Sequence, residues 1–359
     1  MNAKTTRLTV RRREFIALAG AAVAAGAAGE ARAQQQVRKI AIMTPERGTD
    51  MGWNQQGIAS ARAAAQRAGV QIEVAEGLGY PDIRPIMREL AGNGANLIIA
   101  HASGYNTTAF EVGVERNVPV AVVDTPRKVV RPGLIVDYTV SGHEGAYLAG
   151  IIAARTTRGG TLGIVVSGEP PPWNSQSASF ANGARSVKPN IPIRYAVIGP
   201  AAYGDAAGGR RVAEAVIAAG ADVIFGQGNG ATMGMLQGIT TSKAKDGGKV
   251  MLIDVIGDKS GVAQGHLMSS VLWDMTDVFT RMIEDINAGK LGARPYTIGV
   301  ADGSVRLLKT AMIPDPVWAE VEQVKGQIAS GALKIPYVAD AQAVRAMMTD
   351  VQAPPAPPR

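Results

Sequence analysis

The sequence contains no cysteine and only three histidines, and aromatic residues make up 5% of its 359 residues. The lack of cysteine excludes disulfide bonds, thiolate metal sites, a cysteine nucleophile and a lipid-anchored N-terminal cysteine. The histidines His101, His143 and His266 lie far apart in the chain, and neither His-Glu-x-x-His nor Gly-x-Ser-x-Gly occurs. We therefore expect no metal ion, no cofactor and no catalytic site.

Positive charge is concentrated at the N-terminus. Residues 1–33 contain six basic and two acidic residues, so they account for +4 of the formal net charge of +7. Beyond residue 33 no run of Lys or Arg is longer than a pair, which argues against nucleic-acid binding. No stretch beyond residue 33 has the run of about 20 apolar residues that a membrane-spanning helix needs.

Residues 1–33 have the order of segments found in an export signal. An arginine pair at 12–13 precedes an uncharged, Ala-rich run over 15–29, and residues 31–33 (Ala-Arg-Ala) form a small-x-small cleavage site. The arginine pair is typical of twin-arginine signals, which export folded proteins. A basic disordered tail is the alternative. We expect the mature protein to begin near Gln34 and to be soluble and periplasmic.

After the signal, short apolar stretches alternate with stretches of helical spacing. The predicted strands are 37–44, 70–75, 96–100, 118–124, 134–136, 162–167, 193–198, 222–226, 250–255 and 297–300. The predicted helices are 55–69, 83–94, 142–157, 175–187, 205–219, 232–241 and 271–288. Fully apolar strands between helices are typical of parallel sheets covered on both faces, so the fold class is α/β.

The strand–helix alternation occurs as two series of similar length. The stretches 91–99 and 218–225 are similar helix–Gly–strand units, one in each series. Two series favour two Rossmann-like, doubly wound lobes rather than one long sheet. The stretch 353–359 (Ala-Pro-Pro-Ala-Pro-Pro-Arg) is a proline-rich tail that we expect to be disordered.

Ligands bind such sheets at the carboxyl ends of the strands. The stretches that follow the predicted strands are 50–57, 101–106, 124–125, 167–174, 226–230 and 254–258. They contain the aromatic residues Trp53, Tyr105 and Trp173, several amides, and the carboxylates of Asp50, Asp124, Glu169, Asp254 and Asp258, but no Lys or Arg. Rings stack and carboxylates accept hydrogen bonds, so this composition predicts a neutral, flat ligand with N–H or hydroxyl donors.

Each feature also has a structural interpretation. Asp124 and Asn54 can cap the N-termini of helices, and Trp53 can pack against its own helix as a hydrophobic staple. His101 can have a structural role at the end of its strand. Residues 226–231 (Gly-Gln-Gly-Asn-Gly-Ala) fit only the relaxed dinucleotide pattern and follow the third strand of their series instead of the first.

The order of motifs resembles the basic membrane protein family of ABC-transporter substrate-binding proteins, which includes bacterial purine-nucleoside receptors. The stretches that carry the resemblance are 41–43, 50–57, 120–124, 145–154, 220–225, 252–254 and 269–271. The most specific part is Tyr-Leu-Ala-Gly at 147–150, and the likeness extends from about residue 37 to residue 308. It implies a type I periplasmic-binding-protein fold, with three crossovers forming a hinge between the lobes.

The resemblance implies a ligand in the cleft between the lobes. It places Asp50, Trp53, Asn54, Gln55, Asp124 and Asp254 there. The strand-end analysis adds Ser103, Tyr105, Trp173, Gly228, Asn229 and Trp273. We expect an N-terminal lobe of residues 37–138 and 266–292, a C-terminal lobe of 139–265 and 293–345, and a disordered tail over 346–359.

Two departures from the family pattern bear on the ligand. Many members have Ser-Phe-Asn where this chain has Gly-Trp-Asn at 52–54, so the aromatic residue is kept but is larger. Nucleoside-binding members often have a lysine where Trp273 follows Leu272, which makes a bare nucleobase or another aromatic heterocycle more plausible than a nucleoside.

The resulting hypothesis is a periplasmic, non-enzymatic ABC-importer binding protein that delivers a purine nucleoside or nucleobase to a membrane permease. The same scaffold with a sugar or another heterocycle is the first alternative. An exported hydrolase or dehydrogenase is the second. A transcriptional regulator is disfavoured, because the export segment stands where a DNA-binding helix pair would be.

Overall fold

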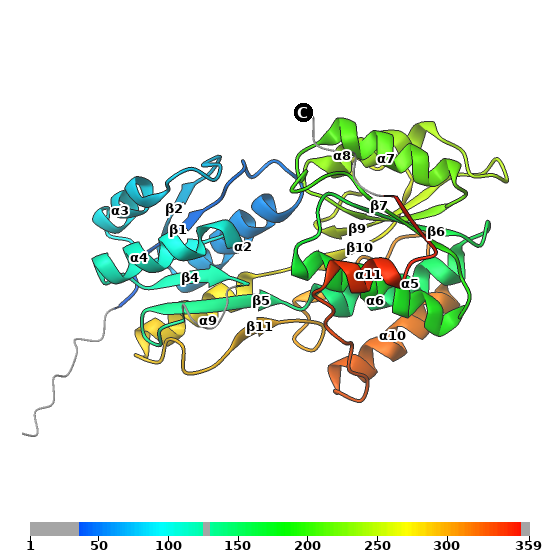
Figure 1. Ribbon diagram of the computed structural model, residues 1–359. Coiled ribbons are helices and arrows are strands. Elements are labelled where there is room, and N and C mark those ends of the chain that lie inside the picture. The colour runs from blue at the N-terminus through cyan, green and yellow to red at the C-terminus, as the bar shows by residue number, and fades with distance from the viewer. Residues whose placement is uncertain (1–35, 125–129, 353–359) are drawn as a thin grey trace, which may run out of the picture.

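The structure is a computed structural model that describes residues 36–124 and 130–352. The predicted export segment 1–33 and residues 353–359 of the tail lie outside the described residues. The described chain forms two α/β lobes, each built around its own sheet (Figure 1). The predicted fold class is confirmed.

The N-terminal lobe contains a six-stranded sheet with the order β11-β5-β4-β3-β1-β2, in which all neighbours are parallel. Its strands are β1 (Lys39–Met43), β2 (Gln71–Ala75), β3 (Leu97–Ala100), β4 (Val120–Val123), β5 (Ile135–Val140) and β11 (Tyr296–Ile298). Its helices are α2 (Trp53–Ala68), α3 (Arg84–Gly92), η1 (Ser103–Tyr105), α4 (Asn106–Arg116) and α9 (Thr276–Asn287). One apolar cluster lies under α2 and α9, and another lies under α3 and α4.

The C-terminal lobe contains a seven-stranded sheet with the order β12-β10-β9-β8-β6-β7-β13. Its strands are β6 (Leu162–Val166), β7 (Ile193–Val197), β8 (Val223–Gln227), β9 (Met251–Ile256), β10 (Leu267–Trp273), β12 (Val305–Leu307) and β13 (Asp350–Gln352). Its helices are α5 (Gly142–Thr156), α6 (Pro171–Val187), α7 (Ala206–Ala218), α8 (Ala231–Thr241), α10 (Asp315–Ala329) and α11 (Ala341–Ala346). Strand β12 is antiparallel to β10, and the other neighbours are parallel.

The chain crosses between the lobes three times, after β5, after β10 and after β11. The crossing segments are hydrogen-bonded to one another: Ser141 N donates to Ile298 O (2.8 Å), and Asp274 N donates to Ser304 O (2.8 Å). Val300 N donates to the Glu144 carboxylate (2.8 Å). The crossovers therefore form one bonded hinge.

The lobe boundaries differ from the sequence prediction. Residues 266–292 were assigned to the N-terminal lobe with a helix over 271–288, but β10 ends only at Trp273 and belongs to the seven-stranded sheet. Strand β10 is almost wholly buried, so its apolar pattern resembles that of a buried helix. Asp274 Oδ1 then accepts from Thr276 N (3.0 Å), and this turn begins α9.

The ends of the predicted C-terminal lobe also differ. Strand β11 lies in the N-terminal sheet although 293–345 were assigned to the other lobe. Strand β13 forms within the predicted tail, where it pairs with β7 at the edge of the seven-stranded sheet.

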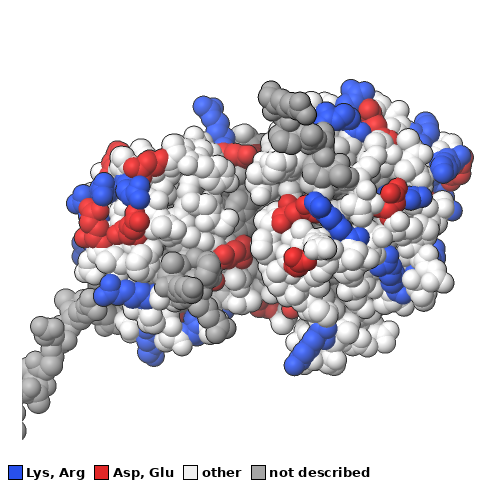
Figure 2. All heavy atoms as spheres, viewed as in Figure 1, with Lys and Arg blue, Asp and Glu red and all other residues white. Residues whose placement is uncertain are grey.

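Charged side chains of both signs are intermixed on the face shown in Figure 2. Arg84 pairs with Asp82 and Glu111, for example, and Arg88 pairs with Glu115. Within the described part of the chain, no helix is both long and apolar enough to cross a membrane.

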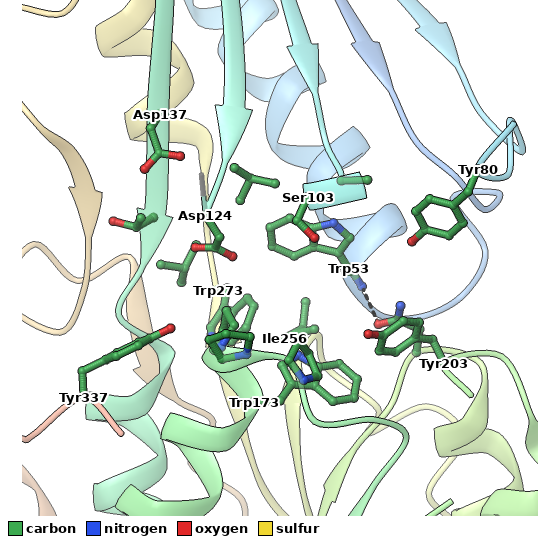
Figure 3. A pocket seen from close by; sticks show the side chains of 18 residues that line it. Trp53, Tyr80, Ser103, Asp124, Asp137, Trp173, Tyr203, Ile256, Trp273 and Tyr337 are labelled. Atoms are coloured by element: carbon green, nitrogen blue, oxygen red, sulfur yellow. Dashed lines mark hydrogen bonds between the residues drawn. The ribbon is translucent and has the colours of Figure 1, made fainter. Parts of the chain in front are cut away.

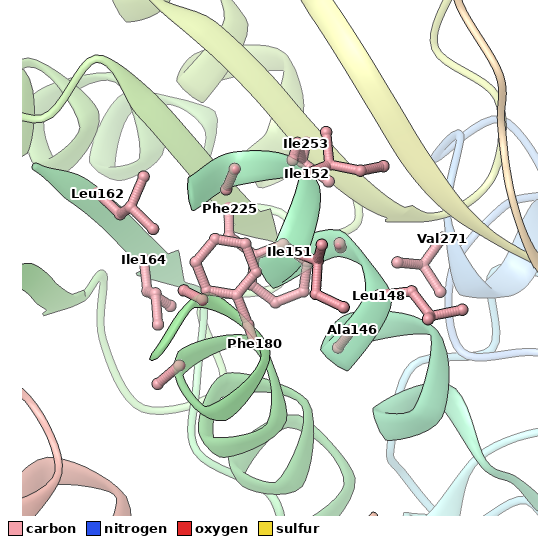
Figure 4. Packing of buried hydrophobic residues seen from close by; sticks show 14 of the residues in the cluster. Ala146, Leu148, Ile151, Ile152, Leu162, Ile164, Phe180, Phe225, Ile253 and Val271 are labelled. Carbon is pink, nitrogen blue, oxygen red and sulfur yellow. The ribbon is translucent and has the colours of Figure 1, made fainter. Parts of the chain in front are cut away.

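Glycines allow α5 and α6 to pack closely in the C-terminal core. A Cβ on Gly150 would lie 2.1 Å from Phe180 O, and one on Gly183 would lie 1.9 Å from Tyr147 O. Beside this contact, Phe180 stacks on Phe225 with ring centroids 4.5 Å apart (Figure 4). The Tyr-Leu-Ala-Gly stretch thus has a packing reason that involves no ligand.

We expect Gly150→Ala to lower the free energy of unfolding by about 1–3 kcal/mol, because backbone of α6 blocks the new methyl group. Gly326→Ala is the matched control: this helical glycine has open space around it, so alanine should stabilise the protein by about 0.5–1 kcal/mol. Thermal unfolding measures both variants. A Gly150→Ala protein as stable as wild type would contradict the packing account.

Candidate functional site

A cavity of about 350 Å³ lies between the two lobes, where the carboxyl ends of both sheets face each other (Figure 3). The residues that line it are Trp53, Tyr80, Ala102, Ser103, Val123, Asp124, Asp137, Thr139, Val140, Pro170, Pro171, Pro172, Trp173, Tyr203, Asn229, Ile256, Trp273 and Tyr337. Six of the predicted site residues are among them: Trp53, Ser103, Asp124, Trp173, Asn229 and Trp273.

Aromatic side chains dominate the walls. Three of the four tryptophans of the sequence line the cavity, together with Tyr80, Tyr203 and Tyr337. Trp53 meets Trp273 edge-on at 6.1 Å between ring centroids, and Trp173 meets Tyr203 edge-on at 5.3 Å. Such walls suit a planar ligand that can stack.

Trp53 is held in place by His101. The indole Nε1 donates to His101 O (2.9 Å), the ring Nε2 of His101 donates to Trp53 O (2.9 Å), and the two rings stack at 3.8 Å. Because the Trp53 carbonyl oxygen can only accept, the ring proton lies on Nε2, and Nδ1 of the neutral ring accepts from the Tyr138 hydroxyl (2.5 Å). Burial lowers the pKa of His101 to about 4, so the ring stays neutral. His101 is therefore a positioning residue.

The carboxylates of the cavity come from neighbouring strands of the N-terminal lobe. Asp124 directly follows β4, and Asp137 lies on β5. Asp124 is exposed where it faces the cavity, and the neighbouring protein desolvates its carboxyl group in part (Figure 3). Burial and the nearby charge of Asp137 raise the pKa of Asp124 to about 7. The described residues that line the cavity include no Lys, Arg or His.

The C-terminal lobe forms the opposite wall of the cavity, and its strand β9 ends in a strained turn at Ile256. This residue has φ 75°, and Gly257 N donates to Val255 O (3.0 Å) across it. A positive φ is costly for a β-branched residue, and strain of this kind concentrates at functional sites. Strand β9 thus presents an apolar side chain to the cavity, two residues beyond Asp254.

The two lobes touch beside the cavity. Trp53 N donates to Asn229 Oδ1 (3.3 Å), a bond between the first residue of α2 and the loop after β8 (Figure 3). Gly52 makes this approach possible, because a Cβ there would lie 2.7 Å from Asn229 Oδ1.

Three predicted ligand residues in the first loop organise the start of α2 instead of lining the cavity. Asp50 accepts from Gln55 N (2.9 Å) and from the Asn54 side chain (2.8 Å). Gln55 Oε1 accepts from Met51 N (3.0 Å). These contacts give the three side chains local structural roles at the start of α2, and none of the three lines the cavity.

The other predicted residues outside the cavity are Tyr105, Gly228 and Asp254. Tyr105 is buried, and its hydroxyl donates to Gly79 O (2.6 Å). Gly228 O accepts from Thr232 Oγ1 (2.9 Å) at the start of α8. Asp254 is buried against Lys259, with 2.7 Å between Oδ2 and Nζ and neither side chain exposed. Burial raises the pKa of Asp254, and the charge of Lys259 opposes that shift.

Sequence reasoning missed Asp137, Tyr80, Tyr203 and Tyr337. Asp137 lies within β5 and not at its end, and Tyr80 lies in the loop after β2. Tyr203 follows β7 and could have been found by the same strand-end rule. Tyr337 comes from the segment between α10 and α11, where no local signal indicates a site. Among the described residues, no group of three or more His, Asp or Glu side chains is placed to hold a metal ion.

The buried pair gives a stability prediction. Lys259→Met leaves the Asp254 charge unpaired, so we expect a loss of about 3–5 kcal/mol in the free energy of unfolding. Adding Asp254→Asn removes that charge and should recover most of the loss. Because Asp254 does not line the cavity, the double variant should bind ligand as wild type does. Denaturant unfolding and calorimetry measure the two effects, and a large loss of affinity in a stable double variant would place Asp254 at the ligand.

The family described as ABC transporter substrate-binding protein PnrA-like matches residues 37–339. Among curated relatives, basic membrane protein A1 of Borrelia garinii subsp. bavariensis is 25% identical over 71% of this chain and 79% of its own length. The ABC transporter nucleoside-binding protein of Lactococcus lactis subsp. cremoris is 26% identical over 89% of this chain and 97% of its own length. A purine-binding protein of Brucella abortus is 24% identical over 86% of this chain and 85% of its own length.

Solved structures agree on the fold. An ABC transporter solute-binding protein of Aeropyrum pernix K1 aligns with a TM-score of 0.72 at 18% identity, covering 86% of this chain and 96% of that chain. Because the family match spans most of the chain, the resemblance predicted from the sequence is confirmed: this protein belongs to the PnrA-like, or basic membrane protein, family of ABC transporter substrate-binding proteins, which are not enzymes.

Proposed function

We propose that this protein binds a purine nucleobase or nucleoside in the cavity between its lobes and delivers it to the permease of an ABC importer. The observation that carries the proposal is the cavity itself: six aromatic side chains surround a space that also receives two adjacent carboxylates. A purine has a flat ring that can stack on the aromatic side chains, and N–H or amino groups that can donate hydrogen bonds to the carboxylates. The names of the Lactococcus and Brucella relatives support the same ligand class.

The size and polarity of the cavity favour the smaller ligands of this class. Its volume of about 350 Å³ is near the lower end of the roughly 300–1,000 Å³ typical of ligand pockets. The carboxylates lie in the N-terminal lobe, whereas the opposite wall presents Ile256 and the prolines 170–172. A ligand with one polar edge and two apolar faces therefore suits it, which favours a nucleobase.

The hinge supplies the transport mechanism. Because the crossovers are bonded to one another, the lobes can rotate about them as two rigid bodies, opening for entry and closing over the ligand. The closed form brings Trp53 N to Asn229 and presents a surface that depends on both lobes, which a permease can distinguish from the open form. We further propose that residues 1–33 direct export to the periplasm by the twin-arginine route.

Isothermal titration with adenine, guanine, hypoxanthine and their nucleosides should give at least one micromolar or tighter ligand. We expect Trp53→Ala to weaken that ligand roughly ten- to a hundredfold, because about 1.5–3 kcal/mol of aromatic burial is lost. Trp318→Ala is the matched control, since Trp318 is the tryptophan outside the cavity, and it should leave the affinity unchanged. Silence of all these purines, with binding of simple sugars, would refute the purine assignment.

The raised pKa of Asp124 predicts a pH-dependent affinity. A ligand that donates a hydrogen bond to this carboxylate needs it ionised, so the affinity should fall as the pH drops through about 7. Asp124→Asn should lose this dependence, whereas Asp246→Asn, at an exposed ion pair with Arg158, should keep it. Ligand titrations at about pH 8.5 and about pH 5.5 measure how the affinity changes with pH. Tighter binding at low pH would mean that Asp124 is a proton donor to the ligand.

A further inference from the structure

Tyr337 reaches the cavity from a part of the chain that belongs to neither sheet. It lies between α10 and α11, in a segment that we call the C-terminal strap, residues 333–347. Tyr337 and Tyr80 are the exposed aromatic residues of the described chain, at 52% and 62% of their surfaces, and both line the cavity. A large exposed ring directed at a cavity is apolar surface that a ligand can cover.

The backbone around Tyr337 is tied to the first turn of α6. Val338 N donates to Ser175 Oγ (3.2 Å), and the Asn174 side-chain amide donates to Ala339 O (2.7 Å). The same amide donates to Glu169 O (2.9 Å), so it joins the strap to the loop that precedes the prolines. The position of the Tyr337 backbone is thus set by the proline-rich wall of the cavity.

A second tie holds the far end of the strap. Arg345, in α11, makes a two-pronged ion pair with Glu169: Nε donates to Oε1 (2.8 Å) and Nη2 pairs with Oε2. The Tyr195 hydroxyl donates to the same Oε1 (3.0 Å). Glu169, a carboxylate of the predicted ligand loops, therefore has its charge paired with the strap. It directly precedes Pro170, Pro171 and Pro172, which line the cavity.

The ring of Tyr337 extends from this anchored backbone into the wall of the cavity (Figure 3). It packs edge-on against His143, in the first turn of α5, with ring centroids 5.4 Å apart. Its hydroxyl points toward the side of the cavity that carries Asp124 (Figure 3). A tyrosine hydroxyl is protonated at neutral pH, so this phenol can donate a hydrogen bond.

We propose that the C-terminal strap is part of the binding site: Tyr337 covers the ligand and sets how long it is retained, and the Arg345–Glu169 pair holds Tyr337 and the proline wall in the binding geometry. Arg345 is then a positioning residue that acts through Tyr337 and the prolines. The proposal rests on the proposed function only in that the cavity binds a small molecule, whatever its class.

The first test measures ligand dissociation. The probes are adenine, guanine, hypoxanthine and their nucleosides, and the signal is the fluorescence of the tryptophans that line the cavity. We expect Tyr337→Ala to raise the dissociation rate about tenfold with little change in the association rate or in the melting temperature, because the ring is half exposed. Tyr337→Phe should have a smaller effect. Tyr147→Phe, which removes a hydroxyl outside the cavity, is the control.

The second test asks whether Arg345 acts through the strap. Arg345→Met should also raise the dissociation rate, and the double variant Arg345→Met/Tyr337→Ala should dissociate about as fast as Tyr337→Ala alone. Arg345→Lys, which keeps the charge but loses the two-pronged geometry, should lie between Arg345→Met and wild type. If the double variant instead shows the product of the two single-variant increases in dissociation rate, Arg345 acts independently of Tyr337. That result would overturn the positioning role.

The remaining outcomes separate the two proposals. If wild type binds a purine and Tyr337→Ala retains it equally long, the strap proposal is wrong and the purine assignment stands. If no purine binds, the purine assignment fails, and the strap is tested by acrylamide quenching of the ligand-free protein. Tyr337→Ala should then expose the cavity tryptophans more than Tyr147→Phe does, and equal quenching would overturn the strap proposal.

Discussion

The reciprocal contact between Trp53 and His101 is the interaction on which the cavity depends. Each residue donates one hydrogen bond to the carbonyl oxygen of the other, and the rings stack between these bonds. The contact joins the first turn of α2 to the end of β3, and Gly57 leaves room for the imidazole under the helix. Because Trp53 N also reaches Asn229, the same residue forms the aromatic wall and touches the second lobe. Burial keeps His101 neutral, so this contact adds no charge beneath the aromatic wall.

The electrostatics of the site follow from where its charges are placed. Away from the cavity surface, Asp50 accepts hydrogen bonds at the start of α2, Glu169 pairs with Arg345, and Asp254 pairs with Lys259. Asp124 and Asp137 line the cavity, and the charge of Asp137 contributes to the raised pKa of Asp124. Under the proposed function, a ligand that donates hydrogen bonds to these carboxylates offsets their mutual repulsion.

Sequence reasoning predicts several of the residues that line the cavity from their place at a strand end. Trp53, Asp124, Trp173 and Asn229 follow parallel strands, and the carboxyl ends of such strands meet at one edge. It failed where a buried strand and a buried helix have similar apolar patterns, as at β10. Asp254, which the resemblance places in the cleft, does not line the cavity; it pairs with Lys259, which the turn at Ile256 brings back to it.

The sequence by itself determined the α/β class, the two strand–helix series and the family, because these depend on periodicity and on local motifs. The tertiary structure alone decided which polar groups face the cavity, since that depends on how distant segments pack, as the pairing of Glu169 with Arg345 shows. Tyr337 is the clearest case. It lies 213 positions after Asp124 and lines the same cavity because hydrogen bonds hold the strap against α6 of the C-terminal lobe.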